Sequence, residues 1–107
     1  MTLRERLEED IRSAMRTRNQ DRLDALRFIK SQIQLTEKNQ QKDLDEPGVI
    51  EVIAKQAKER RESIQMFQEG NRTDLVAKET AALAVVEEYL PPQMTREALA
   101  KIVEEAI

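Results

Sequence analysis

The chain has 107 residues, of which 39% are hydrophobic and 36% charged, and its formal net charge at pH 7 is −3. It contains neither cysteine nor histidine, which excludes disulfides, Cys/His zinc sites, thiol nucleophiles and Ser-His-Asp triads on this chain. Only two glycines and three prolines interrupt a sequence rich in helix-forming residues, so the composition predicts an all-α protein.

Residues 1–39 are predicted to form two helices. Thr2 and Glu5 have capping-box spacing, so the first helix should begin after Thr2 and end near residues 17–19. A short polar link then favours an antiparallel hairpin with a second helix that ends near Asn39. Apolar residues at steps of three and four give both buried faces: Leu3, Leu7, Ile11, Ala14 and Met15, then Leu23, Leu26, Phe28, Ile29 and Ile33.

A third helix is predicted after a polar loop at residues 40–46. Asp45, Glu46 and Pro47 suit a helix N-terminus, because acidic groups favour its positive end and proline fits its first turn. Gly70 is expected to end the helix in the left-handed conformation. The predicted buried face consists of Ile50, Ile53, Ala57, Ile64 and Phe67.

Thr73 is the expected N-cap of a fourth helix, which should end at Pro91-Pro92. Thr95 would open a fifth helix that stops at Ile107 without a capping signal. We therefore expect residues 1–90 to form an N-terminal helical domain, a bundle of about four helices in two antiparallel hairpins. Residues 91–107 would hold the boundary and the first helix of an incomplete C-terminal helical domain. The apolar face of that helix is a candidate for binding a partner helix: Leu99, Ile102, Val103 and Ala106.

Paired acidic residues are the obvious candidates for catalysis or metal binding, and their geometry argues against both. Adjacent residues on a helix point about 100° apart, so pairs such as Glu87-Glu88 and Glu104-Glu105 do not converge on one ligand. No glycine-rich phosphate loop occurs, and Ser63 has no histidine to activate it. We expect no catalytic residue, no metal, no cofactor and no small-molecule substrate.

The strongest polar cluster lies around the end of the third helix and is basic: Lys55, Lys58, Arg60, Arg61 and Arg72. One interpretation is an internal clamp, in which Arg60 or Arg61 pairs with Glu79 and Arg72 pairs with Asp74 or Glu69. The alternative is contact with the phosphates of a folded RNA. The three aromatic residues occupy predicted core positions, which disfavours stacking on single-stranded bases: Phe28, Phe67 and Tyr89.

The central and C-terminal motifs resemble the YqeY family, which is similar to the tail domain of GatB, the B subunit of the tRNA-dependent amidotransferase. These motifs are Lys58-x-Arg60-Arg61-x-Ser63-Ile64-x-x-Phe67-x-x-Gly70-x-Arg72-x-Asp74-Leu75, Lys78-Glu79 and Glu87-x-Tyr89-Leu90-Pro91, with Leu7-x-x-Asp10-Ile11 and Arg22-Leu23-x-x-Leu26-Arg27 before them. The resemblance implies a helical unit followed by a smaller helical bundle.

The resemblance also implies a function and three contact positions, Lys58, Arg60 and Arg72. It predicts a non-catalytic module that assists tRNA-dependent amidation or aminoacylation by binding tRNA, an aminoacyl-tRNA synthetase or an amidotransferase. The family label of carbon–nitrogen ligase with glutamine as amide donor has no matching catalytic residue here. The alternative is a protein-interaction or oligomerisation module without RNA binding. The chain shows no signal peptide or transmembrane run, and a cytoplasmic location is expected.

Overall fold

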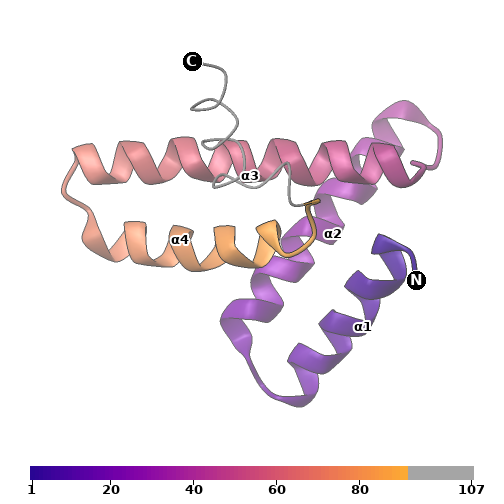
Figure 1. Ribbon diagram of the computed structural model, residues 1–107, viewed down its shortest axis with the longest axis horizontal. Helices are drawn as coiled ribbons and strands as arrows, with labels where there is room; N and C mark the ends of the chain where they lie inside the picture. Colours follow the sequence, from indigo (N-terminus) through magenta and orange to yellow (C-terminus); the bar gives the residue numbers. More distant parts are fainter. Residues whose placement is uncertain (92–107) are drawn as a thin grey trace.

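Four helices account for most of residues 1–91, which are the residues that the computed structural model describes. They are α1 (Leu3–Arg16), α2 (Gln20–Gln40), α3 (Glu46–Glu69) and α4 (Thr73–Glu87). In Figure 1, α3 and α4 lie side by side and run in opposite directions, α2 crosses them, and α1 packs on α2. The predicted all-α bundle of two hairpins is confirmed. The predicted fifth helix and second domain lie outside the described residues.

The starts of α1 and α3 follow the predicted chemistry, and the cap of α2 was not predicted. Thr2 and Glu5 form a complete capping box at α1. Asn19 caps α2, and the Asp45 carboxylate accepts from the backbone N–H of Gly48 at 2.9 Å to cap α3. The prediction of Thr73 as the N-cap of α4 is wrong, because Thr73 is already helical and Arg72 occupies the cap position without a side-chain hydrogen bond.

Three helix ends share one turn geometry. Arg18, Gln41 and Asn71 each adopt a left-handed backbone with φ of 56°. In each turn the N–H of the next residue donates to the carbonyl five positions earlier, at 3.0, 3.2 and 2.8 Å. This is the Schellman closure of a helix C-terminus. The predicted helix end at Gly70 is confirmed, because Gly70 is the C-cap of α3, but its predicted left-handed conformation is wrong: Gly70 has φ of −88° and the left-handed residue is Asn71.

The end of α4 also departs from the prediction. The helix ends at Glu87, before the prolines, and the chain continues in tight turns in which Tyr89 and Leu90 donate to carbonyls three residues earlier, both at 3.1 Å. Tyr89 and Leu90 are nevertheless buried. Three residues in tight turns thus separate the end of α4 from Pro91.

The core lies where α2 meets the other three helices. Its largest fully buried side chains come from three helices: Leu26, Ile29, Val49, Ile53 and Val86. Burial of a side chain of this size contributes about 1.5–3 kcal/mol. Two predicted core residues are exposed instead, Met15 at 52% and Phe28 at 45%. Each lies about 100° around its helix from a buried neighbour, Ala14 and Ile29, and so points away from the core.

Candidate nucleic-acid interface and the polar clusters

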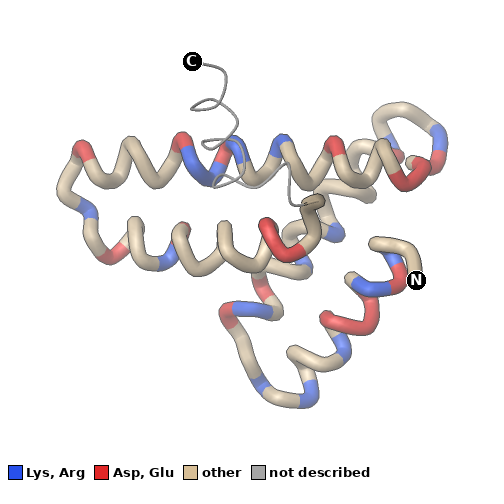
Figure 2. The backbone as a smooth tube through the Cα atoms, viewed as in Figure 1, with Lys and Arg blue, Asp and Glu red and all other residues tan. Residues whose placement is uncertain are grey.

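The predicted basic cluster divides into exposed and half-buried members. Lys55 and Lys58 are exposed one turn apart on α3, and Arg72 is exposed in the turn that joins α3 to α4. Arg60 and Arg61 are half-buried. Figure 2 shows the basic positions of α3 interspersed with acidic ones along the helix. Lys55, Lys58 and Arg72 are therefore the members best placed to meet an external ligand.

Arg60 forms the internal clamp that the sequence predicted. Its Nη1 lies 2.9 Å from Glu79 Oε2 on α4, and both side chains are mostly buried. Its guanidinium also lies 5.2 Å from the centroid of the Phe28 ring on α2, a cation–π distance. Arg60 thus links three helices, and its charge is already neutralised within the described residues.

Arg72 forms the second predicted pair, and Arg61 does not form the pair considered for it. Arg72 Nη2 lies 3.4 Å from Asp74 Oδ2, with both side chains largely exposed, so the pair contributes little to stability. In residues 1–91, two buried guanidinium nitrogens of Arg61 have no hydrogen-bond partner, and neither does the amide of Gln56.

A polar cluster around Tyr89 was not predicted from the sequence. The Tyr89 hydroxyl donates to Asp10 on α1, and the Arg6 guanidinium lies 4.5 Å from the Tyr89 ring centroid. Arg22 on α2 donates to both carboxylate oxygens of Glu88, at 2.8 and 3.2 Å, and lies 3.9 Å from Asp10. We call these five residues the Tyr89 latch. It holds the end of the second hairpin on the first.

The latch changes the ionisation of its members. Burial, followed by the hydrogen bond to Asp10, raises the pKa of Tyr89 well above its usual value. The hydrogen bond to Glu88 raises the pKa of Arg22. Both groups therefore keep their protons, as a structural cluster requires. Asp10, Arg22 and Tyr89 belong to the motifs that carry the family resemblance, which is the signal that could have identified the latch.

A second polar cluster holds the start of α1 against the loop before α3. Arg4 pairs with Glu37 and donates to the carbonyl of Leu44 at 3.0 Å, and the Leu44 N–H donates to Glu37 at 2.8 Å. Hydrogen bonds from Arg4 and from this N–H lower the pKa of Glu37. This cluster holds the loop in place, and the charges of Arg4 and Glu37 are paired with each other.

The predicted divergence of adjacent carboxylates is visible in residues 8–10. Glu8 pairs with Lys30 at 2.7 Å, Glu9 is exposed, and Asp10 belongs to the Tyr89 latch. Within residues 1–91, no group of three or more carboxylates is arranged to hold a metal ion. No helix among the described residues has the length and apolar character of a membrane span.

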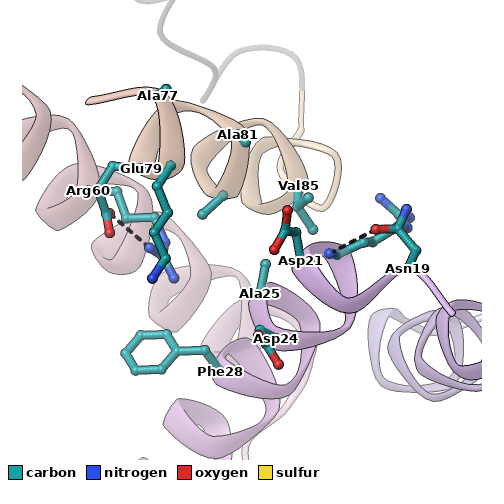
Figure 3. A pocket seen from close by; sticks show the side chains of 13 residues that line it. Asn19, Asp21, Asp24, Ala25, Phe28, Arg60, Ala77, Glu79, Ala81 and Val85 are labelled. Carbon is teal, nitrogen blue, oxygen red and sulfur yellow. Dashed lines mark hydrogen bonds and ion pairs between the residues drawn. The ribbon is translucent and has the colours of Figure 1, made fainter. Parts of the chain in front are cut away.

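A groove of about 760 Å³ separates α2 from α4 (Figure 3). Asp21, Asp24, Ala25 and Phe28 line it on the α2 side, and Arg60 lies at one end. The α4 side consists of three alanines, one valine and two charged residues: Ala77, Ala81, Ala82, Val85, Lys78 and Glu79. The partner-helix candidates of the sequence, Leu99, Ile102, Val103 and Ala106, lie outside the described residues.

Residues 4–107 match the family model described as Yqey-like protein. The chain is 34% identical over 84 residues to "Altered inheritance of mitochondria protein 41, mitochondrial" of Pyrenophora tritici-repentis, which covers 78% of this chain and 46% of that protein. The protein of the same name from Kluyveromyces lactis is 33% identical over 102 residues, covering 92% of this chain and 55% of the relative. The chain thus spans about half the length of the curated relatives it matches.

These names contradict the predicted cytoplasmic location, because the relatives are named as mitochondrial proteins. The prediction rested on the lack of cysteines and of an apolar leader. Such features argue against secretion and structural disulfides, but they do not distinguish the cytoplasm from other compartments.

Proposed function

This chain belongs to the family of Yqey-like proteins, and we propose that it is a non-catalytic helical module that binds tRNA during tRNA-dependent amidation or aminoacylation. The observation that carries the proposal is the exposure of Lys55 and Lys58 one turn apart on α3, with no ion pair to either among the described residues. The name of the relatives supports a mitochondrial site of action.

Phosphate contact is the chemistry that such side chains favour. An exposed ammonium is free to replace the counterions condensed on a phosphate backbone, and each such contact makes binding more sensitive to salt. Arg72 adds a third exposed cation at the end of α3, because its weak pair with Asp74 leaves the guanidinium accessible. Arg60 contributes indirectly, since its pair with Glu79 holds α3 against α4.

Binding rather than catalysis is supported by the placement of the acidic groups. Glu8, Glu9 and Asp10 point to separate surroundings, and the perturbed groups of the Tyr89 latch are paired with one another. The ligase label implied by the family resemblance is therefore not part of the proposal. The module would position an RNA for an enzyme that supplies the chemistry.

The test compares two double variants with the same change in charge. Fluorescence anisotropy with a labelled tRNA transcript, at several salt concentrations, should show weaker binding for Lys55→Ala/Lys58→Ala. The slope of log affinity against log salt should fall in magnitude by about 2 if both side chains contact phosphates. Lys38→Ala/Lys42→Ala, which removes two exposed lysines elsewhere, should leave the slope unchanged. Equal losses in the two variants, or no binding by the wild-type chain at low salt, would refute the proposal.

A further inference from the structure

The groove between α2 and α4 is not explained by RNA contact on α3. Both of its walls are helices, and small or apolar side chains form much of its lining, among them Ala25, Phe28, Ala82 and Val85. The wall on α4 extends from Ala77 to Val85, about 12 Å at the rise of an α-helix. Two helices that face each other across small residues form a site into which a third helix can pack.

Phe28 leaves apolar surface uncovered at this site. The residue lies on a helix, among buried neighbours, yet nearly half of its surface is exposed. Arg60 is placed over the ring, and the rest of the ring borders the groove. An aromatic side chain in this position supplies a large contact area to a docked partner.

The charged side chains that line the groove indicate which class of partner it can bind. The lining holds three acidic and three basic side chains, but Arg60 is paired with Glu79 and Arg22 with Glu88. Asp21 and Asp24 on α2 and Lys78 on α4 form no ion pair among residues 1–91. One wall therefore presents two carboxylates without an ion pair, of which Asp24 accepts a hydrogen bond from Gln20 Nε2 at 2.7 Å, and the other wall presents one ammonium without an ion pair.

We propose that this groove binds an amphipathic helix of a partner protein. The bound helix has a stripe of small or medium apolar residues that enters the groove. On one edge of its apolar stripe, the bound helix carries lysine or arginine, which contacts Asp21 and Asp24. On the other edge it carries an acidic residue, which contacts Lys78. The charges of Asp21 and Asp24 are not neutralised by an ion pair among the described residues and repel a phosphate backbone, which favours a protein over an RNA as the occupant. The site is separate from Lys55 and Lys58 and does not depend on the tRNA proposal.

The test uses a phage-displayed library of amphipathic helical peptides, selected against the full chain. The selected peptides should share a basic edge, and Asp21→Asn/Asp24→Asn should remove the preference for it. Ala82→Glu, inside the groove, should weaken binding about tenfold or more, as expected when a contact at the centre of an interface is lost. Ala81→Glu on the exposed rim is a second blocking variant that does not disturb the half-buried wall.

Ala84→Glu is the matched control, because Ala84 is exposed on the same helix and does not line the groove. It should leave peptide binding unchanged, and thermal melts should show that all variants are folded. The proposal is overturned if no helical peptide is enriched, if the peptides bind the groove variants normally, or if tRNA displaces them. It is also overturned if sedimentation shows self-association that Ala82→Glu abolishes, since the occupant is then a second copy. Loss of tRNA binding in Lys55→Ala/Lys58→Ala with peptide binding intact would separate the two surfaces.

Discussion

The turn between α1 and α2 and the turn between α3 and α4 have the same backbone geometry but the reverse order of two residues. In the first turn, Arg18 is left-handed and Asn19 is the N-cap of the next helix. In the second, Asn71 is left-handed and Arg72 is the N-cap. Asparagine suits both positions, because it tolerates the left-handed region and caps helices well, whereas arginine suits neither.

Each turn is therefore one substitution away from the favourable arrangement. The side chain of Asn19 accepts from the backbone N–H of Arg22 at 3.3 Å, but Arg72 makes no such bond and α4 starts without a side-chain cap. Both turns expose an arginine, but only that of the second turn, Arg72, follows α3. Natural proteins depart from local sequence preferences mainly at functional or strained sites, and this departure agrees with the proposed RNA contact.

The Tyr89 latch joins the two hairpins, and the largest predicted effect tests how much this contact stabilises the fold. Tyr89→Phe removes the hydroxyl that attaches the end of the second hairpin to Asp10 of the first. The free energy of unfolding should fall by about 1.5–3 kcal/mol, the range for a hydrogen bond to a charged group. Urea denaturation at pH 7 measures it, and a variant as stable as the wild type would show that the hydrogen bond between Tyr89 and Asp10 is not stabilising.

The pH dependence of this variant sharpens the same comparison. Because burial raises the pKa of Tyr89 in the folded state, the unfolded chain loses its phenolic proton first as pH rises above about 10. The stability that Tyr89 contributes is thus complete below pH 10 and declines above it. The difference between the wild type and Tyr89→Phe should shrink in that range. A constant difference would contradict the burial of the neutral hydroxyl.

A smaller effect is expected from making the second turn resemble the first. Arg72→Asn supplies the missing cap of α4 and should raise the free energy of unfolding by about 1 kcal/mol. Asn19→Ala removes the existing cap of α2 and should lower it by a similar amount, about 1 kcal/mol. Thermal or urea unfolding of both variants measures the changes. If Arg72→Asn also weakens tRNA binding, stability and function oppose each other at this residue.

The smallest effect concerns the left-handed residue of the first turn. Arg18→Gly should stabilise the fold by roughly 0.5–1 kcal/mol, because glycine adopts a positive φ without steric cost.

Gly70 offers the contrasting case, since its φ is negative and an added Cβ would lie 3.6 Å from the nearest atom, an ordinary contact. Gly70→Ala should therefore be neutral or mildly stabilising. A clear loss of stability in Gly70→Ala would show that the left-handed position had been misassigned.

Local chemistry determined what could be predicted from the sequence. The capping box at Thr2 and the cap at Asp45 depend on residues three apart, so they were predictable. The left-handed position was misassigned to Gly70 because asparagine, one residue later, fills that role equally well. The exposure of Phe28 was missed because periodicity does not show which flank of an apolar stripe a neighbouring helix covers.

Contacts within one hairpin could be predicted from the sequence, and contacts between the hairpins could not. The pairing of Arg60 with Glu79 was predictable because the two residues belong to one hairpin. The Tyr89 latch and the groove were not, because both depend on how α2 crosses the second hairpin, and that crossing brings together residues far apart in the chain. Only the family motifs indicated Asp10, Arg22 and Tyr89 together, and they gave no reason for the grouping.

The hydrogen bond between Tyr89 and Asp10 spans 79 positions of the chain, with consequences for biosynthesis. During synthesis, α1 and α2 emerge from the ribosome before Tyr89 has been translated. The first hairpin must then wait in solution with Leu26 and Ile29 uncovered, since α3 and α4 are needed to bury them. Nascent chains stalled before residue 89 should consequently be the form that chaperones recognise, because they lack the hydrogen bond between Tyr89 and Asp10.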